Sequence, residues 1–289
     1  MTASKWELTK RTFIIWGGHG SMRLAAAVAF YTIMSLAPLL VVALNVLSLH
    51  YGKQAEAKIG QQVNTFVGSQ QAASPGSGFH DLLHYAAHSR HGRIAIILSF
   101  AVALISGSTL FVALQDSLNQ IWDIKPRPGM TWKIILRHRI VAGGMVLVSA
   151  ILLLGSFLIT ASLSVAVHQL GAKVSHVSYL ADSLASFIIS LLLFASIFKV
   201  LPDVTIEWPD IWFGAGVTAV LFVAGKFGLT VYFRLAAVTN PYGAAGSLSA
   251  LLIWVYYSAA LMFLGAAFTR AHTESHGKPI RVNAYAMKR

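Results

Sequence analysis

The stretch YGAAGSLSALLIWVYYSAALMFLGAAF, Tyr242 to Phe268, decides the fold class, because no residue from Ser247 to Phe268 is charged. About 20 apolar residues at a rise of 1.5 Å each cross the roughly 30 Å hydrocarbon core of a bilayer. Small residues near both ends, Gly243–Gly246 and Gly265–Ala267, allow neighbouring helices to approach closely. The stretch therefore predicts a transmembrane helix. The alternative, a buried helix of a soluble protein, is disfavoured by five comparable stretches elsewhere in the chain.

The composition of the whole chain supports the same class. Of 289 residues, 56% are hydrophobic and 11% are charged, and the mean hydropathy is +0.66. Soluble domains are about 25% charged, so these side chains could not cover the surface of a soluble protein. We expect an all-α polytopic membrane protein. The absence of cysteine excludes disulfides and thiol chemistry.

Six hydrophobic segments predict six transmembrane helices, joined by short amphipathic interfacial and extracytoplasmic helices. The segments are residues 24–49, 93–115, 140–167, 180–200, 211–233 and 247–268. Pro38 lies inside the first segment and predicts a kink there, because proline frees a backbone carbonyl in the preceding turn. Residues 1–23 are expected to form a basic amphipathic helix on the inner leaflet, and residues 51–92 an extracytoplasmic helical loop. Residues 269–289 are expected to form a loose, basic cytoplasmic tail. The chain, 1–289, is expected to be a single membrane domain.

Lys and Arg concentrate in the N-terminal segment, in the loop Lys125–Arg139 and in the C-terminal tail. Since cytoplasmic loops carry an excess of these residues, we expect both termini in the cytoplasm of a bacterial inner-membrane protein. The same loops explain the formal charge of +12 without nucleic acid as a partner.

Lys226 is the main candidate for function, because it is an ionisable residue inside the fifth hydrophobic segment. Asp182 is the nearest acidic partner by expected membrane depth, and Gly225 and Gly228 leave room for another helix or a ligand headgroup. Lys226 could act on a substrate or ion, form a structural ion pair, or extend its ammonium to the membrane surface. These three alternatives stay open.

Polar side chains on two other segments are candidates to line a path with Lys226. They are Ser106 and Thr109 in the second segment, Asp116 directly after it, and Asp182 and Ser186 in the fourth. Hydrogen bonds that merely hold helices together explain the hydroxyls equally well. Asp116 and Asn119 are expected at the inner headgroups.

The loop 51–92 carries His80, His84, His88 and His91 on one helical face. Histidines four residues apart can bind zinc or copper or sense pH, although a solvated polar face is the favoured interpretation. The sequence contains no phosphate-binding glycine loop, no HExxH motif and no paired carboxylates at one membrane depth. We therefore expect neither enzymatic activity nor a cofactor.

Four groups of residues resemble the YihY/BrkB family of integral membrane proteins. They are Ala26-Ala27, Phe30-Tyr31, Ser35 and Pro38; Leu118-Asn119 and Trp122; Leu201-Pro202-Asp203, Trp208 and Gly214; and Tyr242-Gly243, Gly246, Trp254 and Gly265. The resemblance implies a bacterial inner-membrane protein with six spans, and members are linked to virulence and to envelope lipid transport. A ribonuclease label attached to the family finds no supporting residues here. The family commonly has Gly-Ala-Glu at the end of the last span, where this chain has Ala267.

We expect a passive or secondary translocator of an amphipathic or anionic envelope molecule, such as a lipid. The alternative is a non-transporting membrane scaffold for envelope biogenesis or virulence, and a membrane-bound hydrolase is the least favoured class. Membrane lipids are the expected partners, with copies of the same chain or envelope proteins as protein partners.

Overall fold

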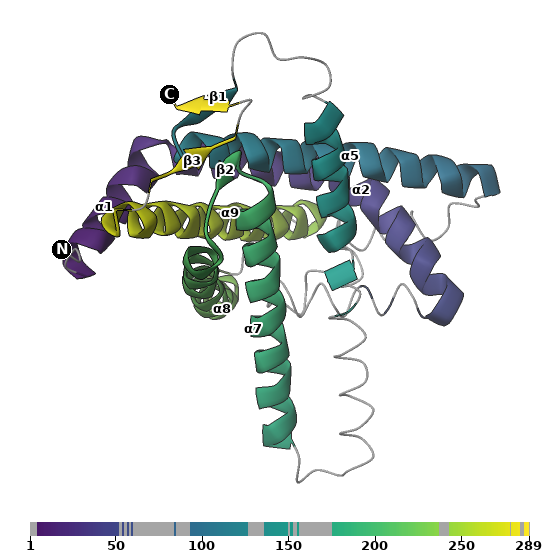
Figure 1. Cartoon of the computed structure of the whole chain (residues 1–289). Helices are drawn as coiled ribbons and strands as arrows, with labels where there is room; N and C mark the ends of the chain where they lie inside the picture. The colour runs from purple at the N-terminus through teal and green to yellow at the C-terminus, as the bar shows by residue number, and fades with distance from the viewer. Residues whose placement is uncertain are drawn as a thin grey trace. The chain divides into compact units, whose positions relative to one another are not determined.

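The computed structural model of the chain is predominantly α-helical (Figure 1). It describes residues 5–51, 54, 57, 59, 84, 93–126, 136–149, 151–152, 155, 175–236, 243–277, 279–283 and 286–288. The labelled helices are α1 (Lys5–Gly18), α2 (Ser21–Tyr51), α5 (Arg93–Ile121), α7 (Ser175–Val200), α8 (Trp208–Ala236) and α9 (Gly243–Ser275). The strands are β1 (Ile124–Pro126), β2 (Val204–Thr205), β3 (Arg281–Val282) and β4 (Ala286–Lys288). Residues 136–149 are also helical.

Three of the described helices contain segments long and apolar enough to cross a membrane. They are Phe100–Ile121 of α5, Trp208–Leu229 of α8 and Leu248–Ser275 of α9. The bent helix α2 makes a fourth candidate span if its two parts, Ser21–Leu36 and Pro38–Asn45, count as one. Helix α7 adds a shorter apolar segment, Phe187–Val200. The helical membrane class is thus confirmed. Most of the expected third span, 140–167, lies outside the described residues, so six crossings stay a prediction.

Two helices are longer than their hydrophobic segments indicate. Helix α5 continues to Ile121 instead of ending at residue 115, and α9 continues to Ser275 instead of ending at residue 268. At 1.5 Å per residue, the 33 residues of α9 extend about 50 Å, beyond the roughly 30 Å of the hydrocarbon core. Hydropathy marks only the lipid-facing part of a helix, and polar residues extend both of these.

The kink predicted at Pro38 is present in α2. The helix bends by 47° between Ser21–Leu36 and Pro38–Asn45. Proline lacks a backbone N–H and its ring clashes with the preceding turn, which bends a helix. Ser35, which is buried, donates its hydroxyl to the Thr32 carbonyl at 2.9 Å.

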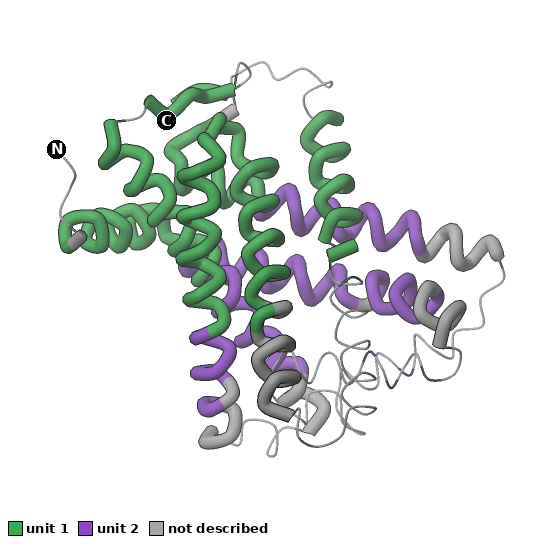
Figure 2. Tube along the Cα trace, turned by 60° about the horizontal axis from the view of Figure 1, so that its bottom comes forward, with its two compact units in different colours: residues 1–21, 115–223, 261–289 green, residues 22–114, 224–260 purple. Residues whose placement is uncertain are grey.

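The chain divides into two compact units, each described here by itself (Figure 2). Unit 1 comprises Met1–Ser21, Gln115–Val223 and Leu261–Arg289, and unit 2 comprises Met22–Leu114 and Ala224–Ala260. Large apolar side chains fill the core of unit 1, including Leu118, Ile121, Leu201, Ile211 and Phe263, each fully buried. In unit 2 the Tyr256 hydroxyl lies 3.0 Å from the Met22 sulfur.

Four short strands in unit 1 connect the chain after α9 to two earlier loops. Strand β4 pairs antiparallel with β1, and β3 pairs antiparallel with β2. The backbone N–H of Asn283 also donates to the Asp203 carbonyl at 3.1 Å. The expectation of a loose tail at residues 269–289 was therefore wrong for its described residues, which continue α9 and then form strands. Such short strands have too few residues to show a period-two pattern in the sequence.

Helices α8 and α9 cross closely in unit 1 through two matching Gly-x-x-x-Thr sequences. Thr218 of α8 lies against Gly265 of α9, and Thr269 of α9 lies against Gly214 of α8. A Cβ at Gly265 would overlap the Thr218 hydroxyl and come within 2.9 Å of the Thr218 Cβ. The two threonines donate to the carbonyls of Gly214 and Gly265 on their own helices, both at 2.7 Å. Small residues four apart produce this close approach in membrane helices.

Helix α1 has one buried and one exposed apolar face. Thr12 and Ile15 are buried, whereas the side chains of Trp6, Phe13 and Ile14 are more than half exposed. The helix is therefore amphipathic as expected, and its position on the inner leaflet stays a prediction.

Candidate functional site

Lys226 lies within the membrane-spanning part of α8, as the sequence predicts. The side chain is half-buried and stands 18 residues after Trp208, at an axial distance of about 27 Å. A Cβ at the adjacent Gly225 would lie 2.7 Å from the Tyr257 hydroxyl oxygen of α9. At Gly228, in contrast, a Cβ would meet no atom within 4 Å. The expected close approach of another helix is therefore present at Gly225 and absent at Gly228.

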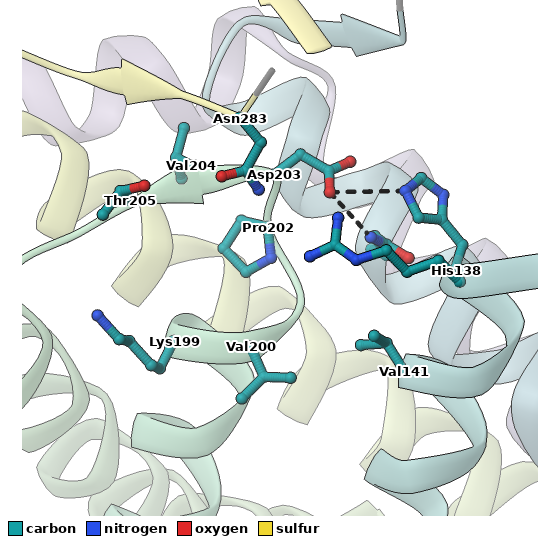
Figure 3. A pocket seen from close by; sticks show the side chains of 11 residues that line it. His138, Val141, Lys199, Val200, Pro202, Asp203, Val204, Thr205 and Asn283 are labelled. Carbon is teal, nitrogen blue, oxygen red and sulfur yellow. Dashed lines mark hydrogen bonds and ion pairs between the residues drawn. The ribbon is translucent and has the colours of Figure 1, made fainter. Parts of the chain in front are cut away.

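A second candidate site forms around Asp203 in unit 1. The turn Leu201-Pro202-Asp203 follows α7, and its carboxylate is 4% exposed. Asn119 of α5 donates to Asp203 Oδ2 at 2.8 Å, and its Oδ1 accepts the Asp203 backbone N–H at 2.8 Å. Gln115 donates to Oδ1 at 3.3 Å, and His138 Nε2 lies 3.6 Å from the same oxygen (Figure 3). The buried carboxylate thus joins α5, the helical residues 136–149 and the turn before α8.

Next to this carboxylate lies a polar cavity of about 210 Å³, which we call the Asp203 pocket (Figure 3). The side chains with charge or hydrogen-bonding capacity around it come from separate parts of unit 1. They are Gln115, Arg137, His138, Lys199, Asp203, Thr205 and Asn283. Two permanent cations, Arg137 and Lys199, therefore line the pocket with one aspartate.

Lys199 is held in place by two contacts. Its Nζ donates to the Ile206 carbonyl at 2.8 Å and lies 5.1 Å from the centre of the Trp208 ring. Trp208 stacks on Trp212 with a centroid distance of 6.2 Å, and both indoles are substantially exposed. Exposed tryptophans concentrate at membrane–water boundaries, which places Lys199 at headgroup level.

A network of charges joins α1, the end of α5 and α9 on unit 1. Arg270 Nη2 lies 2.6 Å from Asp123 Oδ2, and its Nε lies 2.9 Å from Glu274. Glu274 also pairs with Arg11 at 2.8 Å, and His19 Nε2 lies 2.9 Å from Asp123 Oδ1. Arg270 additionally donates to the Ile121 carbonyl, one of the carbonyls left open at the end of α5.

Asp123 makes unfolding sensitive to acid. Partial burial raises the pKa of its carboxyl, but hydrogen bonds and charge from His19 and Arg270 outweigh that and hold the pKa below its ordinary value of 3.8. The carboxylate therefore stabilises the fold above the pKa of the unfolded chain, and this contribution is lost as pH falls through the folded pKa. We expect the difference in thermal unfolding temperature between the wild type and Asp123→Asn to shrink below about pH 4, compared with its value at about pH 5. A difference that grows as pH falls from about 5 to about 3 would contradict this assignment.

The predicted polar path is only partly described. The hydroxyls of Ser106 and Thr109 donate to carbonyls of their own helix, at 3.3 and 3.1 Å, and Asp116 is exposed. Asp182 and Ser186 lie on α7, and their side chains are outside the described part. A lining role for these residues stays a prediction.

The family-motif residues have different environments. Asn119 does not reach the headgroups as expected, because it is buried against Asp203 beside the buried Pro202. Trp208 is 53% exposed, Tyr31 is 37% exposed, and Trp254 is half-buried. Gly243 and Gly246 lie in the first turn of α9, and Tyr242 is outside the described residues.

The histidine stripe of loop 51–92 is largely outside the described residues. His84 is helical and exposed, and His80, His88 and His91 are not described. Metal binding there stays untested.

Sequence reasoning missed the residues around Asp203 and Asp123. Arg137 and Lys199 were counted only as cytoplasmic charge, and His138 was not considered. The useful signal was the presence of Asn119 and Asp203 in two separate family motifs, which meet in space.

Comparison with known proteins agrees with a membrane protein. The chain is 25% identical over 248 residues to a UPF0761 membrane protein of Ralstonia nicotianae, with 84% of this chain and 54% of the relative covered. It is 26% identical to one of Verminephrobacter eiseniae, covering 85% and 57%, and 28% identical to one of Tolumonas auensis, covering 85% and 78%. The chain thus spans little more than half the length of the first two relatives. No solved structure matches it.

The family is shown by a match that covers most of the chain. The sequence model described as "Virulence factor BrkB" matches residues 15–287, which include both candidate sites and all four groups of motif residues. The chain therefore belongs to the BrkB virulence factor family of membrane proteins.

Proposed function

We propose that the protein is a passive or secondary translocator of an amphipathic or anionic envelope molecule, such as a lipid, in the bacterial inner membrane. The observation that carries this proposal is the position of Lys226, a half-buried cation inside the apolar span Trp208–Leu229. In this proposal the protein is not an enzyme.

The energetic cost of Lys226 supports a functional role. A lysine costs about 2.5–3.5 kcal/mol at the centre of a membrane helix on insertion scales, and ionisable residues within a span usually face protein or a water-filled cavity. Lys226 stands three residues before the end of the span Trp208–Leu229, so its cost lies below that figure. The partial burial of Lys226 agrees with such a position. A cation there would favour the anionic part of a substrate as it crosses the bilayer.

The contacts of unit 1 support the proposed orientation. Strand pairing and ion pairs join α1, the segment after α5, the turn after α7 and the segment after α9. Residues 1–23, 122–139, 199–207 and 270–289, which include these segments, carry 15 of the 22 Lys and Arg residues of the chain. We therefore place them together in the cytoplasm, with both termini.

Replacing Lys226 with methionine is expected to abolish translocation while the protein is still made and inserted. The test is reconstitution in liposomes that contain a fluorescent anionic phospholipid, with its movement between leaflets measured by dithionite quenching. Lys125→Met is the matched control, because it removes the same charge from an exposed position on β1. Lys226→Arg should keep part of the activity. Movement at the wild-type rate in Lys226→Met would remove Lys226 from the mechanism.

A non-transporting scaffold is the second candidate, and the close crossing of α8 and α9 favours it. Gly214 and Gly265 pack directly against threonines of the facing helix, which leaves no space between the helices there. The scaffold predicts that wild-type liposomes show no more lipid movement than protein-free liposomes.

A further inference from the structure

We propose that the Asp203 pocket binds a phosphate group, with Arg137 and Lys199 as its main ligands. This inference goes beyond the translocation proposed above and does not depend on Lys226. It concerns unit 1 alone, and it assigns a ligand class to a pocket whose residues come from α5, α7, β2, residues 136–149 and the chain after β3.

The charge around the pocket favours an anion. The pocket contains the cations Arg137 and Lys199, and His138 adds charge when it is protonated. The one aspartate of the lining, Asp203, already accepts hydrogen bonds from the amides of Asn119 and Gln115, and His138 Nε2 lies 3.6 Å from its Oδ1. The lining therefore carries two permanent cations against one carboxylate.

Lys199 is positioned to donate to a ligand. An ammonium group has three N–H donors, and the contact with the Ile206 carbonyl uses one of them. The Trp208 ring lies against the same ammonium and restricts its motion, which lowers the entropy lost on binding. Arg137 contributes a planar guanidinium, whose fork of donors matches two phosphate oxygens.

The size of the pocket limits the ligand. Its volume of about 210 Å³ is below the roughly 300–1,000 Å³ typical of sites for drug-sized ligands. It is nevertheless several times the roughly 30 Å³ that a water molecule occupies in the liquid. A phosphate group with its first substituent fits this range, and a whole nucleotide does not.

Two sources can present such a group, a phospholipid headgroup and a soluble phosphate. The exposed pair Trp208 and Trp212 places Lys199 at headgroup level, so the lipid is the favoured source. The neighbouring Val141 and Val200 give the pocket an apolar edge, which suits a group attached to acyl chains.

The test uses the full chain in an uncharged maltoside detergent. Dioleoyl phosphatidic acid and inorganic phosphate are titrated in separate arms, and binding is followed by native mass spectrometry for the lipid and by ³¹P NMR line width for the ion. We expect Arg137→Gln and Lys199→Gln each to weaken phosphate binding at least about tenfold, because each removes a charge-assisted hydrogen bond. Arg139→Gln is the matched control, since it removes the same charge two residues from Arg137, at an exposed position that does not line the pocket.

The two arms identify the source. Retention of one phosphatidic acid per chain, lost in Arg137→Gln but not in Arg139→Gln, assigns a lipid headgroup. A broadened ³¹P signal of inorganic phosphate that stays broad when the lipid is added assigns a soluble phosphate. Either result supports the pocket as a phosphate site.

Equal affinities in Arg137→Gln, Lys199→Gln and Arg139→Gln, or no binding in either arm, would overturn the inference. Arg137→Lys keeps the charge and should retain more phosphate binding than Arg137→Gln, which separates loss of the charge from loss of folding. The proposed translocation is tested separately by Lys226→Met. If Arg137→Gln and Lys199→Gln lose phosphate binding while lipid movement is unchanged, the Asp203 pocket is a phosphate site and translocation does not depend on it.

Discussion

Alanine at Gly265 is expected to destabilise the protein, because a methyl group there has no space in the α8–α9 contact. The new Cβ would lie within 3.1 Å of both the Cβ and the Cγ2 of Thr218, and it would overlap the hydroxyl. Rotation of the threonine cannot relieve this, since all three of its side-chain atoms are too close. The helices must separate, at a cost typical of overpacking, about 1–3 kcal/mol. Thermal unfolding in detergent, followed by circular dichroism, measures the loss.

Two variants distinguish the close crossing from a general effect of replacing glycine. Gly216→Ala is the matched control, because a Cβ there meets nothing within 4 Å and alanine favours helix by up to about 1 kcal/mol. We expect it to be neutral or stabilising. Thr218→Gly combined with Gly265→Ala exchanges the two small positions and should recover part of the lost stability. Equal unfolding temperatures for Gly265→Ala and Gly216→Ala would show that the crossing is not close.

Removing the carboxylate of Asp203 is the second large effect that we expect. Asp203→Ala leaves the amides of Asn119 and Gln115 without their acceptor inside unit 1. A buried donor left without its acceptor costs about 1–3 kcal/mol, and this substitution leaves two. Because the Asn119 side chain also holds the Asp203 backbone N–H, the turn between α7 and α8 should loosen as well. We expect a strong decrease in folded protein, measured by fluorescence-detected size-exclusion chromatography.

The control for Asp203 is an exposed acid in the same turn. Glu207→Gln removes a carboxylate from the surface, where substitutions usually change stability by less than about 0.5 kcal/mol. Asp203→Asn should resemble Asp203→Ala. The new side chain has an NH₂ group in place of one carboxylate oxygen, so one of the amides of Asn119 and Gln115 would face another donor. A folded yield of Asp203→Asn equal to wild type would show that the charge is dispensable and that shape alone holds the turn.

The sequence predicted the membrane class, the position of most described helices and the kink at Pro38, because these follow from local hydropathy and from proline chemistry. Helix ends were less predictable. Helix α9 continues through Arg270, and that cation pairs with Asp123, a residue 147 positions earlier. No spacing along one helix reveals such a partner, and the sequence therefore predicts that the span ends before this charge.

Of the two candidate sites, the sequence likewise predicted one and missed the other. Lys226 was predictable because a charge stands out in an apolar run. The Asp203 pocket was not, since its residues are scattered over α5, residues 136–149, the turn after α7 and the chain after β3. Asn119 and Asp203 were noted separately, and only the fold brings them within 2.8 Å. Likewise, Gly214 and Gly216 look equivalent in the sequence, and only one faces a threonine.

The strand pairs of unit 1 determine the order in which the protein can be completed during synthesis. Strands β1 and β2 leave the ribosome well before β3 and β4, because α8 and α9 are translated between β2 and β3. Their backbone amides must stay hydrated or be covered by another chain until then. Membrane insertion of the helices therefore precedes the pairing of β1 with β4 and of β2 with β3. A ribosome stalled within α9 would leave β1 and β2 accessible to chaperones and proteases.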